Sequence, residues 1–307
     1  MGLSIGIDVA KHTLEWAAGS SEKIQHTRNE PRPIAGLVRR LITLEPERIV
    51  VESTGGYERR LVAKLAEAGL PVVVVNPRRV RSFGQGMGFL AKTDAIDARL
   101  LALFGEKAEP PIRPILQGTD RLLADLVARR RQLVSMIVAE KNRKETAPPA
   151  VLRTIHPVLR SLEKLVREIE QHIDAMLCQD AERAELLTLL QTVPGVGPAV
   201  ARTLLIDLPE LGHLGRREIA SLVGVAPFAR DSGTFRGVRR IRGGRASVRT
   251  ALYLAAMTAS RFNPTLAKVY QRLRKAGKPP KLAFVAIARK LLVALNAIAR
   301  DRTAWQA

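Results

Sequence analysis

Four acidic residues stand in an order along the chain that could bring their carboxylates into one site. Asp8 ends a short apolar run and Glu52 ends a β-branched run, while Asp94 and Asp97 lie three residues apart. On a helix, that spacing places both aspartates on one face. Four carboxylates brought together repel one another unless cations neutralise them, and oxygen-only clusters suit Mg²⁺ or Mn²⁺. The sequence therefore predicts a magnesium site that manganese could also fill.

Phosphoryl transfer is the chemistry that such a site would serve. Two metal ions about 4 Å apart can activate an attacking oxygen and stabilise the leaving one. Each acid also has a plainer interpretation, Asp8 as a turn residue and the Asp94 and Asp97 pair as the start of a helix. Glu52 is harder to explain in that way, because it follows three apolar residues and would lie near a buried strand end. The order of all four residues favours the metal site.

The segment 230–249 is the second candidate for chemistry, because it holds seven arginines and one acid, Asp231. Glycines among the arginines would let the backbone approach a phosphodiester while guanidinium groups bind its oxygens. Ser232 could attack phosphorus there, since positive charge stabilises the alkoxide and the transition state. Chemistry alone favours a turn residue at Ser232, and the competing Ser247 suits the start of a helix. We expect phosphate contacts from most of the arginines, namely Arg230, Arg236, Arg239, Arg240, Arg242 and Arg245.

Two other places offer contacts to nucleic acid. Gly195 and Gly197 lie between two helical patterns, as glycines do in helix-hairpin-helix elements whose backbone N–H groups reach a phosphate. A purely structural turn is the alternative. Arg129, Arg130 and Arg131 interrupt a long helical pattern and can face either solvent or phosphate. We predict nucleic-acid binding at both places.

The overall charge agrees with a polyanionic partner. Fifty Lys and Arg against 29 Asp and Glu give a net charge of +21, with a pI near 11.1. Such an excess supplies phosphate contacts, so nucleic acid is the expected partner, and no lipidation signal or basic amphipathic helix indicates a membrane. Cys178 is the single cysteine, which excludes an intramolecular disulfide and a thiolate zinc cluster. With no signal peptide and no uninterrupted apolar stretch long enough for a bilayer, we expect a cytoplasmic, nucleoid-associated protein.

The elements that must position the acids are alternating strands and helices. The predicted strands cover 3–9, 12–18, 23–27, 48–52 and 71–75, and the predicted helices cover 33–44 and 57–68. Three opening strands followed by helix-strand-helix-strand-helix is the order of a ribonuclease H-like α/β sheet. In that sheet the first and fourth strands are neighbours, so Asp8 and Glu52 can converge.

The rest of the chain is predicted to be mainly helical. Long helical patterns cover 120–145 and 157–177, and Pro148-Pro149 between them favours a helical hairpin or coiled-coil arm. The second pattern has an apolar seam formed by Val158, Leu162, Leu165 and Ile169. An amphipathic helix over 282–299 suits core packing. We therefore predict an α/β domain over 1–109, a linker and arm over 110–184 and a mainly α domain over 185–307.

Together these motifs resemble the DEDD transposases of bacterial insertion sequences, the insertion-sequence 110 family. The acidic motifs that carry the resemblance are Gly6-Ile7-Asp8-Val9-Ala10-Lys11, Val51-Glu52-Ser53-Thr54-Gly55 and Lys92-Thr93-Asp94-Ala95-Ile96-Asp97-Ala98. The later motifs are Pro194-Gly195-Val196-Gly197, Leu222-Val223-Gly224, Arg230-Asp231-Ser232-Gly233 and Gly243-Gly244-Arg245. They follow the family's order over nearly the whole chain.

The resemblance implies more than the residues do. It implies a RuvC-like domain in which Asp8, Glu52, Asp94 and Asp97 hold magnesium. It also implies a C-terminal domain in which Ser232 is a nucleophile that forms a covalent phosphoserine link to DNA. It also implies a guide, the bridge RNA, whose loops pair with double-stranded donor and target DNA. Family members form homodimers that pair into homotetramers, with each active site shared between two protomers.

The sequence leaves two other functions open. A metal-dependent, structure-selective endonuclease of the Holliday-junction-resolving kind would need the four acids but not Ser232 or the C-terminal domain. A non-catalytic nucleic-acid-binding protein would need only the fold, and four intact carboxylates argue against it. Aromatic residues make up 4% of the chain, so we expect recognition of the nucleic-acid backbone to dominate over base stacking.

Overall fold

The chain divides into two compact units, 1–117 and 118–307. The computed structural model describes residues 2–19, 21, 23–89, 94–228, 231–232, 235–237 and 239–306, with the side chains of 94–95, 231–232 and 235–236 left out. Both long helices of the expected arm belong to the second unit. The three-part division at residues 109 and 184 stays a prediction.

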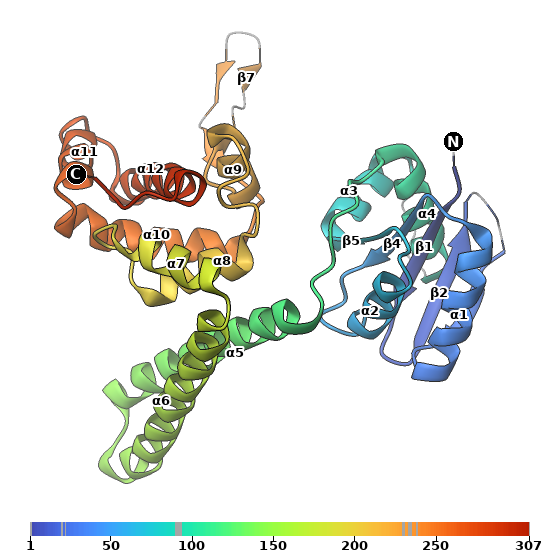
Figure 1. The fold of residues 1–307 in the computed structure, drawn as a ribbon, viewed down its shortest axis with the longest axis horizontal. Helices are drawn as coiled ribbons and strands as arrows, with labels where there is room; N and C mark the ends of the chain where they lie inside the picture. Colours follow the sequence, from blue (N-terminus) through green and yellow to red (C-terminus); the bar gives the residue numbers. More distant parts are fainter. Residues whose placement is uncertain are drawn as a thin grey trace. The chain divides into compact units, whose positions relative to one another are not determined.

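In the described part of the first unit, five strands form one mixed sheet in the order β3-β2-β1-β4-β5 (Figure 1). Its strands are β1 (Ser4–Val9), β2 (Thr13–Ala18), β3 (Gln25–Arg28), β4 (Arg48–Glu52) and β5 (Val72–Val75). The first three strands pair antiparallel, and β4 pairs parallel with both β1 and β5. The predicted ribonuclease H-like order and the neighbouring first and fourth strands are therefore observed.

Helices cover both faces of this sheet because its central strands are apolar on both sides. The helices are α1 (Pro31–Leu44), α2 (Arg59–Glu67), α3 (Pro77–Gly86) and α4 (Asp94–Ala108). On one face, Ile7 and Val51 share a buried cluster with side chains of α1 and α2. On the other, Val50 shares one with side chains of α3 and α4, such as Leu101. Alternate residues of β1 and β4 thus face opposite helical layers.

Two long helices open the second unit, α5 (Gly118–Thr146) and α6 (Pro149–Cys178). They pack against each other, with Leu133 and Ile137 of α5 in one buried cluster with Ile155 and Leu159 of α6. A loop of two residues joins the two helices, so they run antiparallel. The predicted helical pair is observed, and its description as a coiled coil stays a prediction.

Two details of this pair differ from the sequence expectation. Val158 and Leu165 are exposed, and the buried seam of α6 begins at Ile155 and Leu159 and continues through Leu162. The two sets have the same heptad spacing, so spacing alone does not choose between them. The helix also begins at Pro149 rather than at Pro157, which lies inside it. Pro157 is exposed, so water can satisfy the carbonyl that its missing N–H leaves unpaired.

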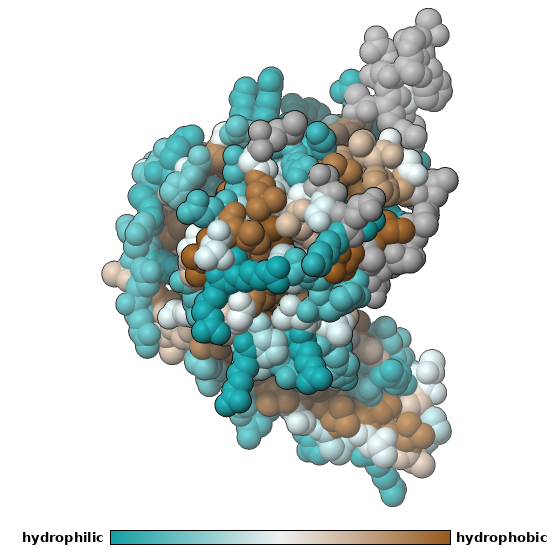
Figure 2. All heavy atoms as spheres, turned by 90° about the vertical axis from the view of Figure 1, so that its right-hand side faces the viewer, coloured by the Kyte–Doolittle hydropathy of each residue, from teal (hydrophilic) through white to brown (hydrophobic). Residues whose placement is uncertain are grey.

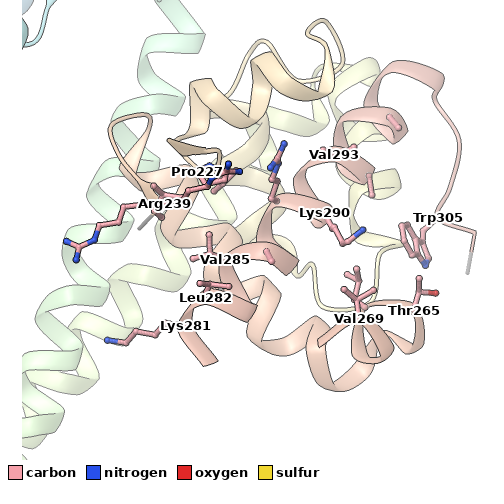
Figure 3. Close-up of a pocket in the computed structure, with 18 residues that line it drawn as sticks. Pro227, Arg239, Thr265, Val269, Lys281, Leu282, Val285, Lys290, Val293 and Trp305 are labelled. Atoms are coloured by element: carbon pink, nitrogen blue, oxygen red, sulfur yellow. The ribbon is translucent and has the colours of Figure 1, made fainter. Parts of the chain in front are cut away.

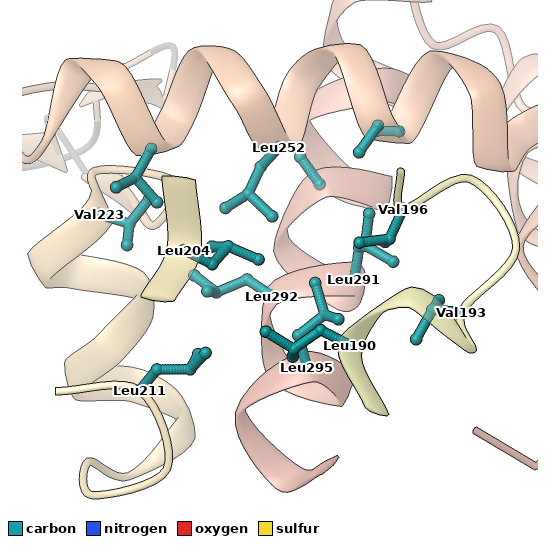
Figure 4. Close-up of a cluster of buried hydrophobic side chains, with 14 of the residues drawn as sticks. Leu190, Val193, Val196, Leu204, Leu211, Val223, Leu252, Leu291, Leu292 and Leu295 are labelled. Atoms are coloured by element: carbon teal, nitrogen blue, oxygen red, sulfur yellow. The ribbon is translucent and has the colours of Figure 1, made fainter. Parts of the chain in front are cut away.

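The remaining helices surround one apolar core, shown in Figure 4. They are α7 (Ala181–Gln191), α8 (Pro198–Asp207), α9 (Arg216–Val223), α10 (Ala246–Phe262), α11 (Pro264–Lys275) and α12 (Pro280–Asp301). Leu204 of α8, Leu252 of α10 and Leu292 of α12 are fully buried in this core. Short strands lie between α9 and α10: β6 (Pro227–Phe228), β7 (Asp231–Ser232), β8 (Phe235–Arg236) and β9 (Arg240–Ile241). The expected mainly α domain is observed, with these short strands in addition.

One helix has the length and composition of a candidate membrane span, although Arg289 and Lys290 interrupt its apolar run. By length and composition α12 could cross a membrane, and half of its most apolar window is buried. Ile287, Leu291 and Leu295 of α12 are completely buried in the core of the second unit. We therefore interpret α12 as a core helix, as its amphipathic pattern predicted.

Candidate active site and nucleic-acid interface

Asp8 and Glu52 lie at the carboxyl ends of neighbouring parallel strands. The register pairs Ile5 with Ile49 and Ile7 with Val51, so its next positions are Asp8 and Glu52. Adjacent strands are about 4.8 Å apart, so the two backbones are close enough for both carboxylates to bind one ion. Both residues are partly buried.

Both carboxylates belong to the face of the sheet that α4 covers. Ile7 and Val51 point to the opposite face, and alternation along each strand therefore turns Asp8 and Glu52 toward α4. Gly6 confirms which face this is, since a Cβ on Gly6 would lie 2.1 Å from the Ala98 carbonyl oxygen of α4. The absence of a side chain at Gly6 is what lets α4 lie directly on β1.

Asp97 precedes Ala98 and is thereby carried on the helix that covers this face. Its side chain is 15% exposed, and its Oδ1 lies 3.9 Å from Nη1 of Arg81 on α3. Sequence reasoning did not single out Arg81, because one arginine among several in a basic helix gives no separate signal. This separation is near the outer limit of an ion pair, so the contact links α3 to α4 only weakly.

Asp94 begins α4, and its side chain is outside the described part of the structure. Among the described side chains, no three Asp, Glu, His or Cys residues are grouped closely enough to hold a metal ion. The predicted four-carboxylate site therefore stays a prediction. The donors fit a hard divalent cation, because Asp8, Glu52 and Asp97 offer only carboxylate oxygens on one face of the sheet.

Glu58 organises the loop that follows Glu52. Its Oε2 accepts hydrogen bonds from the backbone N–H of Thr54 (3.2 Å), the Thr54 hydroxyl (3.1 Å) and the backbone N–H of Gly56 (2.8 Å). Burial alone would raise the pKa of Glu58, but hydrogen bonds from its own N–H and from Gly56 and Thr54 outweigh burial and lower it. The charged carboxylate thus holds the loop in place.

The Ser232 segment is a short hairpin. Ser232 pairs with Phe235 and Asp231 with Arg236 in the antiparallel strands β7 and β8. The side chains of Ser232 and Arg236 are outside the described part of the structure, and so is the whole of Arg230. Their predicted roles in catalysis and phosphate binding stay predictions.

The other predicted arginines fall into two groups. Arg239, Arg240 and Arg242 are exposed on the segment that follows the hairpin. Arg245 instead donates two hydrogen bonds to the carboxylate of Glu210, at 2.5 and 2.6 Å, and one to the carbonyl oxygen of Asp207 at 2.9 Å. The exposed arginines suit phosphate contacts, whereas Arg245 joins the segment to the helical core.

A similar contrast exists within the arginine triplet of α5. Arg130 pairs with Glu170 at 2.6 Å and Arg131 with Asp207 at 2.5 Å. Arg129 is exposed and donates to the neighbouring Gln132. A phosphate would find Arg129 more available than the other two, because binding them would break existing ion pairs.

The glycines also have packing roles. Gly195 has a φ of +102°, and a Cβ there would lie 2.7 Å from the backbone of Ala259 on α10. Gly197 is exposed at the N-terminus of α8, so it alone of the two presents an open backbone to a ligand. The close approach to Ala259 gives Gly195 the structural interpretation that the sequence left open.

An apolar groove of about 1,110 Å³ lies beside the exposed arginines (Figure 3). Leu282, Val285 and Val293 of α12 form part of its apolar wall, while Arg239 and Lys290 stand among its cations. The lining of this groove is thus apolar with positive charges. Hydrophilic side chains cover much of the molecular face drawn in Figure 2, with hydrophobic patches between them.

Two family models match the chain. Residues 5–157 match the DEDD model of insertion-sequence 110 elements, described as a transposase. Residues 187–271 match the model described as transposase of the IS116/IS110/IS902 family. The first match contains Asp8, Glu52, Asp94 and Asp97, and the second contains Ser232.

Relatives match over both units. The pilin gene-inverting protein of Moraxella bovis is 26% identical over 97% of this chain and 95% of its own length. An uncharacterised 43.6 kDa protein of insertion element IS110 from Streptomyces coelicolor is 30% identical over 51% of this chain and 38% of its own. A solved Thermus thermophilus RuvC structure covers 34% of this chain and 92% of its own, with 19% identity and a TM-score of 0.26. The fold is assigned from the strand order of the sheet and not from this similarity.

Proposed function

Since the chain belongs to the IS110 family of DEDD transposases, we propose that it recombines DNA with a carboxylate-bound magnesium site and a serine nucleophile. The observation that supports this best is the parallel register of β1 and β4, which brings Asp8 and Glu52 to one sheet edge under α4. Asp94 and Asp97 on α4 would complete the set of ligands. Bound magnesium would stabilise negative charge on the reacting phosphodiester.

Ser232 carries the covalent step in this proposal. Its hydroxyl oxygen attacks phosphorus, the bond from phosphorus to one deoxyribose oxygen breaks, and that oxygen leaves as a hydroxyl with a proton. The serine proton is given up, so the step is a balanced transesterification. The exposed Arg239, Arg240 and Arg242 would bind neighbouring phosphates and neutralise charge. Reversal by a hydroxyl of another strand rejoins the DNA.

The named relatives support rejoining over hydrolysis. Inverting a gene, as the name of the Moraxella protein describes, requires that DNA be cut and rejoined. We extend the proposal to a bridge RNA as the guide for donor and target DNA, and to homodimers that pair into homotetramers. A protein of this kind acts in the cytoplasm.

The test is a search for the covalent intermediate. Purified protein is mixed with its flanking noncoding RNA, magnesium, and donor and target DNA, and the products are separated on a denaturing gel. We expect a protein–DNA adduct with the wild type and none with Ser232→Ala or Asp8→Ala. Omission of the RNA is a further arm, and loss of the adduct there would support the guide.

Cleavage without an adduct, unaffected by Ser232→Ala, would refute the serine mechanism. The protein would then be a metal-dependent endonuclease, the alternative that the acids alone allow. Binding of nucleic acid with neither cleavage nor adduct would leave the non-catalytic alternative.

A further inference from the structure

Asn29 lies between the two loops that follow the strands of Asp8 and Glu52. Its side chain is buried, and its Nδ2 donates to the carbonyl oxygens of Ala10 (3.0 Å) and Tyr57 (3.2 Å). Ala10 is two residues beyond Asp8, and Tyr57 is five beyond Glu52. One amide group therefore joins both loops.

This position requires a side chain that donates hydrogen bonds. Both partners are backbone carbonyls, which accept hydrogen bonds and never donate them, so the nitrogen of Asn29 must face them. An aspartate has the same shape but no N–H, and would turn an oxygen toward two carbonyl oxygens. The backbone N–H of Asn29 also donates to the His12 carbonyl oxygen at 2.9 Å, which fixes the residue against the first loop.

The second loop is also held by Glu58, which accepts the three hydrogen bonds from Thr54 and Gly56. Gly55 and Gly56 have φ values of +78° and +124°, so this loop has little conformational preference of its own. The side-chain hydrogen bonds of Asn29 and Glu58 must therefore hold this loop in one conformation.

We propose that Asn29 is a positioning residue for the metal site, acting with Glu58 to fix the separation of the Asp8 and Glu52 carboxylates. The inference rests on the proposed function, since it needs a metal at that site. Groups that orient metal ligands without touching the metal commonly change its affinity 10–100-fold when removed. Asn29→Ala and Asn29→Asp should each weaken metal binding about tenfold, which is the lower end of this range.

The experiment measures Mn²⁺ binding to the full chain by electron paramagnetic resonance, with a thermal melt of each variant. Wild type is compared with Asp8→Ala, Asn29→Ala, Asn29→Asp and Asn296→Asp. Asn296 is the matched control, because its buried amide also joins loop groups, donating to the Leu214 carbonyl at 2.9 Å and accepting from the Gly212 N–H at 2.9 Å. Its loss should lower the melting temperature and leave Mn²⁺ affinity unchanged.

A second readout separates positioning from general damage. The Mg²⁺ concentration for half-maximal adduct formation should rise about tenfold in Asn29→Ala, with the maximal rate largely recovered at saturating Mg²⁺. A purely structural role would lower the active fraction without moving that concentration. If Asn29 variants do not fold, Glu58→Ala removes the acceptor of all three hydrogen bonds of the second loop and should shift Mn²⁺ affinity in the same direction.

The outcomes are distinguishable. Wild-type binding that Asp8→Ala abolishes and Asn29→Ala leaves unchanged would overturn this inference while the proposed metal site stands, as would unchanged affinity in Glu58→Ala. A wild-type chain that binds no Mn²⁺ would overturn both. Equal weakening by Asn29→Asp and Asn296→Asp would show that the effect is general destabilisation.

Discussion

At the scale of single residues, the packing of α4 on the sheet depends on glycines, which have no side chain. Gly6 lies two residues before Asp8, and its bare backbone lets α4 pack directly on β1. Gly105 does the same further along α4, where a Cβ would lie 2.9 Å from side-chain atoms of Ser4 and Val50. The position of Asp97 relative to Asp8 therefore depends on a close contact between helix and sheet.

Gly6→Ala should disable the site. The new Cβ would lie 2.1 Å from the Ala98 carbonyl oxygen, so α4 must move. We expect a stability loss of about 1–3 kcal/mol, typical of overpacking, and a loss of adduct formation of about 100-fold, because small misplacements cost that much. Urea unfolding and the denaturing gel measure the two effects.

The matched control for Gly6 is Gly36→Ala in α1. Nothing lies within 4 Å of the Cβ that Gly36 would gain, and alanine favours helices. Stability should rise by up to about 1 kcal/mol with activity unchanged. Equal activity of Gly6→Ala and Gly36→Ala would contradict the role we assign to the contact of α4 with β1.

Glu58 gives a prediction about pH. Its pKa is lowered in the folded chain, so ionised Glu58 stabilises the fold above its unfolded value of 4.5, and this stabilisation disappears as pH falls through the lower, folded pKa. The free energy of unfolding of the wild type should exceed that of Glu58→Gln by about 1 kcal/mol or less near pH 7, because solvent screens a partly exposed carboxylate. The difference should shrink below about pH 4.5. A constant difference in urea unfolding between pH 7 and pH 3.5 would contradict this.

At the scale of elements, the sequence predicted the sheet well because its strands carry strong local signals. The strand over 48–52 is observed with the predicted bounds, since a β-branched run stopped by Thr54-Gly55-Gly56 leaves little choice. Asp8 and Glu52 were therefore placed correctly at neighbouring strand ends. Asn29 was not foreseen, because an asparagine before Pro31 looks like an ordinary turn residue until the loops that it joins are known.

The helical parts were harder to predict in detail, because the partner of a helix decides which face is buried. The seam of α6 at Ile155 and Leu159 depends on α5, which a pattern within α6 does not contain. The short strands β6 to β9 were missed because two-residue strands have no periodicity. The role of Arg245 was also missed, because its partner Glu210 is 35 residues away in sequence and a local pattern does not contain it.

The two sides of α12 provide a test at this scale. Leu292 is completely buried in the core of the second unit, whereas Leu282 is 47% exposed on the groove. Leu292→Ala should cost about 2–5 kcal/mol, the range for a buried leucine, and Leu282→Ala less than about 1 kcal/mol. Urea unfolding of the full chain measures both. A large cost at Leu282 would mean that this side is also buried, for example in an assembly of copies.

At the scale of the whole molecule, a charge of +21 does not act evenly. Some of the basic side chains are already paired with acids within the fold, as in the ion pairs of Arg130, Arg131 and Arg245. Exposed arginines such as Arg242 remain for an external polyanion. Binding of nucleic acid should therefore depend on specific exposed cations as well as on total charge.

Salt dependence separates these two groups of arginines. If the chain makes about six to ten phosphate contacts, its affinity for duplex DNA should fall by about 10³–10⁵ between 50 and 200 mM salt. Arg242→Ala should reduce the slope of log affinity against log salt by about 1 and leave stability unchanged.

Arg245→Ala should instead cost about 2 kcal/mol of stability, because Glu210 loses its bidentate partner, and should leave the slope unchanged. Fluorescence anisotropy at several salt concentrations and urea unfolding of each variant measure both quantities. The reverse pattern, with the slope changed by Arg245→Ala alone, would mean that Arg245 leaves Glu210 to bind phosphate in the complex.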